Sequence, residues 1–591
     1  MIEPRIYRVA FLPALLAAVV TMFALESQPR GVPQAAAADV LFEGTSATST
    51  TRSIVERTPD RRVGTPGDAA AAQRVAGAFR RFRLTTTVDR WSDDGRQLVN
   101  VVGRRPGVSR RQVVVLVPRD ALSVPDATGT AADTAALIEF GRVLEGRATR
   151  KTIVLASVDG STRGEEGARR AARKVAEEGP VEALVVLTNL GVRRPRGPLL
   201  VGASNDDSRV SIGLRRTAAN ALRNEVGDDG GGFGSPLTQF GRLAFPAGIG
   251  TQAVLLEDGR PAIRISGSGE LAPPRERREL DDLGTERYEE LGRAGLRLMF
   301  TLDESARPPE HGPRSYITLA GRVAPRLPLA MLALALILPV LVASVDALAR
   351  ARRRHEVVLP WVGWVVAGVL PFAFGLALAE LLVLVGLADD APPTPLDPSA
   401  AEIDGGAAGV LAGLVVAIGV AFFLVRRSAP ARRDPSGGGA GVVVSLGLCA
   451  LALAAWAINP YTAFALVLPL HVWMLAVLAD ARARTRVWLV LVGLLPAAVI
   501  VGTYALHLRM GPLDGAWYLF LLVTGHHVGL ISALLGCVAL GLLAAVVAIV
   551  VTHARRSEPA PAHVPGRGGR RPVDDRSVSG PAGPPLERVR R

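Results

Sequence analysis

Histidine and cysteine are almost missing from the first half of the chain. Residues 26–326 contain one histidine, His311, and no cysteine. The two cysteines of the protein, Cys449 and Cys537, lie in apolar runs of the second half. The first half therefore holds no disulfide and no thiolate-bound metal, and a zinc site there would depend on carboxylates and His311.

Aromatic residues are also scarce, at 5%, although hydrophobic residues make up 49% of the 591 positions. That composition is too apolar for an ordinary soluble protein, while a charged fraction of 21% is too high for a chain wholly in lipid. The net charge of +14 comes from arginines at the ends of apolar runs and in the last 40 residues. Membrane orientation explains that pattern, so we expect a lipid bilayer as partner and no nucleic acid.

Apolar runs of about 20 residues, long enough to cross a bilayer, occur once near the N-terminus and repeatedly after Leu327. We predict eight spans, at 6–25, 327–345, 359–387, 407–425, 441–458, 461–478, 487–506 and 527–551. The amphiphilic stretch 517–524 is predicted to be interfacial or re-entrant.

Charge alternates along the loops between these spans. The acidic loop at 388–404 belongs outside, and the arginine clusters belong inside. These arginines are Arg350, Arg352, Arg353, Arg354, Arg426, Arg427, Arg482, Arg484 and Arg486. The sequence thus predicts a multi-pass protein of the cell membrane with both termini cytoplasmic and residues 40–326 extracytoplasmic.

Five regions follow from this division. Residues 1–26 are an N-terminal anchor or a signal peptide. Residues 40–305 form the exported domain, 306–326 a linker, and 327–552 a membrane domain of about seven helices. Residues 553–591, rich in Arg, Pro and Gly, are predicted to be a disordered basic cytoplasmic tail.

Short β-branched runs alternate with helical stretches in the exported region. The runs are 112–117, 152–158, 183–187, 199–201 and 262–266, and the helical stretches are 68–83, 131–144, 164–178, 208–225 and 281–302. Near-continuous apolar strands between amphipathic helices predict an α/β domain with a mostly parallel sheet and helices on both faces. The second half predicts an α-helical polytopic bundle.

Several local strings, in order, resemble the M28 family of zinc aminopeptidases across residues 53–301. They are the turn RVGTPG at 62–67, the strand LVNVV at 98–102, the strand 113–120, the helix start GTAADTA at 129–135, and TQ at 251–252 followed by GRPA at 259–262. The resemblance implies a peptidase-like fold. The layout of one anchor, an M28-like domain and several later spans is similar to membrane-bound M28 relatives, including the non-hydrolytic subunit of the GPI transamidase.

The resemblance also implies where a pair of zinc ions would be held. The family's two histidines fall at Pro118 and Gln252, its glutamate pair near Asp159, and a ligand aspartate at Gly191. Glu165 and Glu166 come several residues too late for the glutamate pair.

Two of the family's aspartates are kept, as Asp120 and Asp133. With Asp159 they would leave a cluster of cleft carboxylates, which predicts no catalytic residue and no zinc. Calcium, which accepts oxygen ligands alone, is the cation that such a cluster could take. The other interpretation is structural, with Asp133 capping its helix and Asp159 capping a turn.

Four ionisable residues lie in or near the predicted spans: Glu380, His471, His526 and His527. Charge in hydrocarbon is costly, so such groups mark either a transport path or helix packing. Only His471 is placed deep, and this favours packing.

We therefore predict a non-catalytic binding or scaffold protein, with an envelope protein or peptide in the exported cleft. One alternative is an active membrane-bound aminopeptidase with an altered site, and another is a transporter or lipid-handling protein gated by the exported domain. The composition, rich in Ala, Arg, Val and Gly, is typical of high-GC, actinobacterial-type coding, which would make the exported side the cell envelope.

Overall fold

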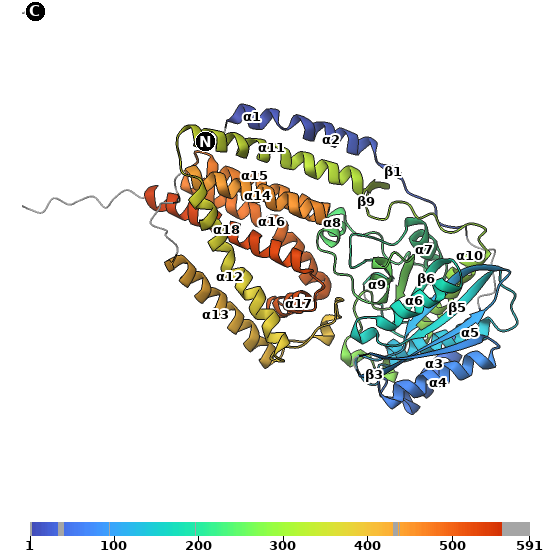
Figure 1. The fold of residues 1–591 in the computed structure, drawn as a ribbon. Coiled ribbons are helices and arrows are strands. Elements are labelled where there is room, and N and C mark those ends of the chain that lie inside the picture. Colours follow the sequence, from blue (N-terminus) through green and yellow to red (C-terminus); the bar gives the residue numbers. More distant parts are fainter. Residues whose placement is uncertain are drawn as a thin grey trace, which may run out of the picture.

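The computed structural model describes residues 3–33, 41–93, 95–195, 197–428, 435 and 438–557. They form an α/β domain and a bundle of long apolar helices, which lie side by side in Figure 1. The last helix continues to Ser557, past residue 553, from which the tail is predicted. Residues 558–591 lie outside the described part of the chain.

A seven-stranded sheet is the centre of the α/β domain, in the order β2-β3-β5-β4-β6-β8-β7. Its strands are β2 (Thr85–Asp93), β3 (Arg96–Arg105), β4 (Ser109–Pro118), β5 (Lys151–Val158), β6 (Val181–Thr188), β7 (Leu200–Val201) and β8 (Ala262–Ser266). The central strands β5, β4, β6 and β8 are parallel, whereas β2 with β3, β3 with β5, and β7 with β8 pair antiparallel. The sheet is therefore mixed: the predicted parallel arrangement holds at the centre and not at the edges.

Burial explains which strands the sequence pattern identified. Residues 113–117 of β4 are almost fully buried, as expected for a parallel strand covered on both faces. The edge strand β2 is polar and half exposed, so it lacks the apolar run that marks a strand in the sequence.

Helices cover both faces of the sheet. They are α3 (Gly44–Arg57), α4 (Pro66–Arg81), α5 (Ala132–Val143), α6 (Glu166–Glu178), α7 (Ile212–Val226), α8 (Pro236–Ala244), α9 (Thr251–Glu257) and α10 (Thr285–Glu304), with short turns at Ala127–Ala131, Ser161–Arg163, Arg275–Arg277 and Leu280–Asp282. Phe79 of α4 packs against Gly103 of β3, while Asn100 of the same strand donates to the Gly167 carbonyl of α6 at 2.8 Å. Residues 100 and 103 point to opposite faces of a strand, so α4 and α6 lie on opposite sides.

A second, three-stranded sheet joins the two parts of the molecule. Its order is β1 (Glu26–Ser27), β10 (Arg322–Pro325) and β9 (Tyr316–Leu319), all antiparallel. The segment 306–326, expected as a linker, thus contains two strands. Of these two, β10 pairs with β1, which follows the first span, and β9 pairs with β10.

Eight helices of the described chain are long and apolar enough to cross a membrane, in agreement with the eight predicted spans. They are α1 and α2 together (Pro4–Val9 and Leu12–Phe23), α11 (Arg326–Arg353), α12 (Leu359–Leu384), α13 (Gly405–Ser428), α14 (Gly438–Ile458), α15 (Pro460–Leu478), α16 (Ala483–Leu508) and α18 (Leu530–Ser557). The stretch predicted as interfacial is a shorter apolar helix, α17 (Pro512–Thr524). The chain has the helices of a multi-pass membrane protein.

The two ends of the bundle differ in charge. The N-terminus and the end of α18 lie away from the α/β domain, whereas α17 lies toward it (Figure 1). The arginines in the last turns of α11, α13 and α18 are at the end away from the domain. The acidic loop between α12 and α13 reaches the domain instead.

The first span is part of the bundle. Tyr7 Oη donates to His471 Nδ1 at 2.6 Å, and the Phe11 ring stacks on the His471 ring at 5.4 Å. Thr21 Oγ1 also donates to the Pro328 carbonyl of α11. These contacts join the first span to α11 and α15.

The α/β domain docks on the bundle through the carboxyl end of α8. The carbonyls of four successive residues, 243–246, each accept a hydrogen bond from a bundle side chain: Asn459 Nδ2 at 2.7 Å, Thr462 Oγ1 at 2.6 Å, Tyr504 Oη at 2.5 Å and His527 Nε2 at 2.9 Å. The last carbonyls of a helix have no partner inside it, so the bundle supplies the bonds that α8 lacks.

Candidate functional site

The carboxyl ends of the central strands meet at one edge of the sheet, which faces a cavity of about 130 Å³. Pro118 is the last residue of β4, and Asn189 directly follows β6. We call this cavity the cleft. Its lining includes Pro118, Asp120, Asp126, Asp133, Glu165, Asn189, Thr251, Arg264 and, from the loop between α12 and α13, Thr394, Pro395, Leu396, Asp397 and Ala400.

Asp120 is held by four hydrogen bonds. Ser161 donates to it from its backbone N at 2.9 Å and from Oγ at 2.8 Å, and Thr162 donates from its backbone N and from Oγ1, each at 2.8 Å. Burial raises the pKa of Asp120, against these bonds, which favour the anion. Both carboxylate oxygens are occupied by the turn that follows β5.

Asp133 lies in the first turn of α5, and it is almost fully buried. It accepts from the backbone N–H groups of Asn189 at 2.7 Å and Leu190 at 2.9 Å. Burial raises the pKa of this carboxyl well above its ordinary value. Asp133 therefore ties the start of α5 to the end of β6 and does not cap its own helix.

Asp159 does not join the other two aspartates, which corrects the predicted cluster of three. It accepts from Val99 N at 2.9 Å and Gly160 N at 2.8 Å, and one of its oxygens lies 3.4 Å from Arg119 Nη2. Arg119 is fully buried and forms a two-point ion pair with Asp68, at 2.8 and 2.9 Å. Asp159 thus turns away from the cleft toward a buried ionic group.

Gly191, Gln252 and Pro118 are the remaining positions that the resemblance compares with zinc ligands. Gly191 packs so closely that a Cβ there would lie 2.6 Å from Leu283 and 2.8 Å from Ala132. The amide of Gln252, fully buried, donates to the carbonyls of Ala203 and Ile249. Neither residue lines the cleft, whereas Pro118 does.

Glu165 and Arg264 are cleft residues that the sequence reasoning missed. Thr251 Oγ1 donates to Glu165 at 2.8 Å, and burial raises the pKa of Glu165 to about 8. Arg264 donates to the Glu270 carbonyl at 2.9 Å, while its Nε has no hydrogen-bond partner among the described residues. Glu165 was set aside because of its position in the sequence, and the turn at Ser161–Arg163 brings it back to the cleft.

The loop between α12 and α13 contributes residues to the lining of the cleft. Asp397 Oδ2 accepts from Ala272 N at 2.6 Å, and Tyr518 Oη of α17 donates to the Leu396 carbonyl at 2.8 Å. Thr394 is 5% exposed. This loop therefore sits between the bundle and the strand ends as part of the cleft wall.

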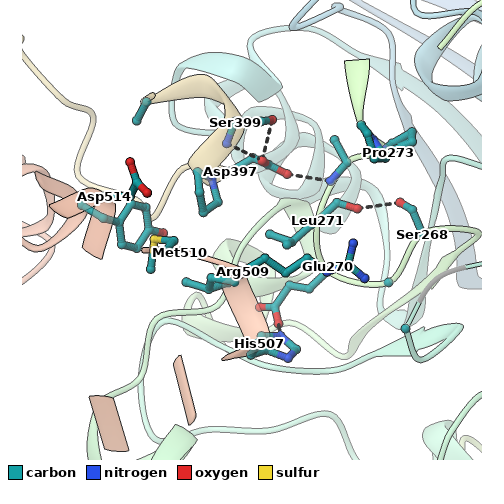
Figure 2. Close-up of a pocket in the computed structure, with 18 of the residues that line it drawn as sticks. Ser268, Glu270, Leu271, Pro273, Asp397, Ser399, His507, Arg509, Met510 and Asp514 are labelled. Atoms are coloured by element: carbon teal, nitrogen blue, oxygen red, sulfur yellow. Dashed lines mark hydrogen bonds and ion pairs between the residues drawn. The ribbon is translucent and has the colours of Figure 1, made fainter. Parts of the chain in front are cut away.

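Beside the loop lies a larger cavity of about 520 Å³ between the α/β domain and the bundle (Figure 2). Glu270 projects into it and accepts from His507 Nε2 at 2.7 Å and from Arg242 Nη2 at 2.6 Å. Burial opposes the charge of Glu270, but Arg242 outweighs that effect and lowers the pKa of the carboxyl. The pair with His507 of α16 is thus another link between the domain and the bundle.

The donors around the cleft do not fit a zinc ion. Zinc in proteins takes imidazole, thiolate and carboxylate ligands, and its sites need several of them together. Among the described residues no group of three or more His, Cys, Asp or Glu side chains is arranged to hold a metal. Asp120 and Asp133, the two predicted aspartates that line the cleft, already accept six hydrogen bonds between them.

The four ionisable residues of the predicted spans lie in two settings. His471 is enclosed by Tyr7, Phe11 and the Leu336 carbonyl, to which its Nε2 donates at 2.9 Å. At the end nearer the α/β domain, His526 lies 4.0 Å from Glu380, with 72% of the His526 side chain exposed. His527 belongs to the docking contacts of α8.

Structural comparison finds similar solved proteins for under half of the chain. A glutaminyl cyclase from an Acidobacteriales bacterium is 18% identical and covers 45% of this chain and 98% of its own, with a TM-score of 0.35. The zinc aminopeptidase BSAP from Bacillus subtilis is 12% identical, with 46% and 99% covered and a TM-score of 0.37. A leucine aminopeptidase precursor from Bacteroides thetaiotaomicron is 14% identical, with 46% and 99% covered and a TM-score of 0.34. No model of a protein family matches the sequence, and no curated protein does.

Proposed function

We propose that this protein is a non-catalytic scaffold of the cell envelope, in which an M28-like exported domain is held in a fixed position on a membrane bundle. The observation that carries the proposal is the state of the two cleft aspartates. Asp120 and Asp133 are used by the surrounding turn and backbone, and a loop from the bundle forms part of the cleft wall.

The docking contacts support the fixed position. Four carbonyls at the end of α8 and the carboxylate of Glu270 bind side chains of the bundle. The three-stranded sheet adds a second attachment, since β1 follows the first span and β10 precedes α11. A domain held at several separate points is suited to bracing the membrane helices or presenting a surface.

The charge pattern supports the orientation. We place the arginine-bearing end of the bundle in the cytoplasm, with both termini, and the α/β domain outside. An envelope peptide or protein that entered the cleft would have to displace the loop, so a partner would bind the outer surface of the domain more readily.

Metal content and peptidase activity test this proposal on the full-length protein in detergent. Zinc and calcium are measured by mass spectrometry, alongside cleavage of a panel of aminoacyl fluorogenic substrates. The same assays are run on Asp397→Ala, which removes the acceptor for Ala272 N and loosens the loop, and on Asp390→Ala, an exposed position of the same loop.

We expect no stoichiometric zinc and no cleavage from any of the three proteins. Cleavage that appears in Asp397→Ala and is abolished by a chelator would mean that the loop hides an enzyme. Zinc at one ion per chain or more, with chelator-sensitive cleavage in the native protein, would also refute the scaffold.

A further inference from the structure

A cavity of about 380 Å³ lies between the α/β domain and the domain-facing end of α16. We call it the arginine pocket, after Arg209, Arg215 and Arg242, which line it. Its other lining residues include Ser204, Asp206, Gly231, Gly232, Phe233, Thr238, Gln239 and Glu270 from the domain, and Thr503, Tyr504 and His507 from α16.

Two of the three guanidinium groups have no counter-ion. Arg215 donates to the Gly231 and Gly232 carbonyls, each at 2.7 Å, and Arg209 donates to Gln239 Oε1 at 2.7 Å and the Tyr316 carbonyl at 3.1 Å. All these partners are neutral. Within the described part of the chain, no carboxylate forms an ion pair with either arginine.

The acids of the pocket are already engaged elsewhere. Glu270 binds Arg242 and His507. Asp206 accepts from Ser204 and Ser208, and it pairs with Arg314 at 3.1 Å. Within the described residues neither Arg209 nor Arg215 therefore has a carboxylate at ion-pair distance, and Asp229, which pairs with Arg223, acts on Arg215 only at longer range.

Burying guanidinium groups that have no ion-pair partner costs free energy when no ligand is bound. Arg215 is 8% exposed, and burial lowers its pKa to about 10; the charge of Arg209 adds to this lowering, while Tyr316 and Asp229 oppose it. Phe233 stacks 4.6 Å from Arg215, and Tyr316 lies 4.9 Å from Arg209, which offsets part of the cost. A buried donor, Arg242 Nη1, has no hydrogen-bond partner among the described residues. Two arginines without an ion-pair partner thus line one cavity, beside a third whose Nη1 is buried without a partner.

We propose that the arginine pocket binds a phosphate group. Guanidinium groups match phosphate oxygens with two parallel N–H donors, and an anion would supply the charge that the lining lacks. The pocket lies at the membrane side of the domain, where Thr503 and Tyr504 of α16 form one wall. Its phosphate comes either from a lipid headgroup of the facing leaflet or from the free ion. The arginines of this site do not line the cleft, with which the pocket shares Glu270, and the site does not depend on the scaffold proposal.

Calorimetric titration of the full-length protein in detergent tests the site with two probes. One is inorganic phosphate, and the other is a short-chain phosphatidylglycerol below its micelle concentration. Saturable binding of either at one per chain supports the proposal. Binding of the lipid at least about tenfold tighter than the ion identifies a headgroup site, and equal or weaker lipid binding identifies a site for free phosphate.

Three variants locate the binding. Arg215→Gln removes one cation and is expected to weaken binding about tenfold or more. Thr238→Glu places a carboxylate in the pocket and is expected to abolish binding. Position 238 lies in the first turn of α8, after the capping residue Ser235, where Glu is favourable, so this variant keeps its fold. Arg216→Gln is the control, because Arg216 is the next residue on α7 and contacts the Pro29 carbonyl instead.

The thermal midpoint of each variant without phosphate separates loss of binding from loss of fold. The proposal is overturned if neither probe binds the native protein. It is also overturned if folded Thr238→Glu binds as the native protein does, or if Arg216→Gln loses as much affinity as Arg215→Gln.

Discussion

The cleft and the arginine pocket lie in one domain beside the same bundle, but their charged side chains differ in the partners that they have. In the cleft, Asp120 and Asp133 accept hydrogen bonds from neighbouring backbone, and a loop from the bundle forms one wall. In the arginine pocket, Arg209 and Arg215 have only neutral partners. The two aspartates of the cleft are thus held by hydrogen-bond donors of the fold, whereas the two arginines of the pocket have no ion-pair partner among the described residues.

The largest effect on stability is expected from removing Arg119, the cation of the buried ionic group with Asp68 and Asp159. Arg119→Met leaves Asp68 and Asp159 buried without their cation, which costs about 3–5 kcal/mol of unfolding free energy. Thermal unfolding of the full-length protein measures the loss. Arg62→Gln, at an exposed ion pair with Asp60, serves as control and is expected to leave the midpoint in place. A native midpoint for Arg119→Met would mean that the group has no structural role.

The buried carboxyl of Glu165 in the cleft is expected to make the stability of the protein depend on pH. Its folded pKa of about 8 lies above the ordinary 4.5, so between these values the folded state holds a proton that the unfolded state has lost. This group therefore favours folding fully below pH 4.5, and its contribution declines as the pH rises toward 8. Glu165→Gln mimics the protonated form and should raise stability at pH 8 by on the order of 3 kcal/mol, with little change at pH 5.

Midpoints at pH 5 and pH 8 check this expectation. Glu166→Gln, the next residue along the chain, pairs with exposed Arg173 and is the matched control. An equal effect of Glu165→Gln at both pH values would mean that its carboxyl is ionised in the folded protein.

Closure of the cleft can be measured by labelling. Thr394→Cys, at a position 5% exposed, should react with a water-soluble maleimide at least about tenfold more slowly than Val108→Cys, which is 96% exposed. The native cysteines are both buried and add little background. Adding Asp397→Ala should speed the reaction at Thr394→Cys. Equal rates at the two single positions would show an open cleft and remove the contrast with the arginine pocket.

The smallest effect is expected at the docking surface. His527→Ala removes the donor to the Pro246 carbonyl and should cost about 1 kcal/mol. His526→Asn is the control, because His526 is exposed and has a φ of +60°, which Asn tolerates. Thermal midpoints distinguish the two neighbours. A loss at His526 that matched the loss at His527 would contradict the assigned role of His527.

Much of the architecture could be predicted because its signals are local. A span of 20 apolar residues and a run such as 113–117 are each readable within one short window. The edge strand β2 and the short helices α8 and α9 carry weaker patterns, and their positions depend on the elements that they pack against. The linker was misjudged for a related reason, since β10 is a strand only through its pairing with β1 and β9.

For the candidate site, too, some features could be predicted from the sequence and others depended on the tertiary structure. By itself, the sequence determined which residue types exist in the exported half: one histidine, no cysteine, and Pro118, Gly191 and Gln252 at the positions that the resemblance compares. Chemistry that needs absent side chains can be judged from composition alone.

Only the tertiary structure decided which of the remaining charges meet. Asp159 faces Arg119, Glu165 returns to the cleft, and Arg209 and Arg215 line a pocket against α16 without a counter-ion. The physical reason is that the state of a charged group depends on the dielectric and the partners around it. These partners come from segments tens to hundreds of residues away, so no window of the sequence contains them.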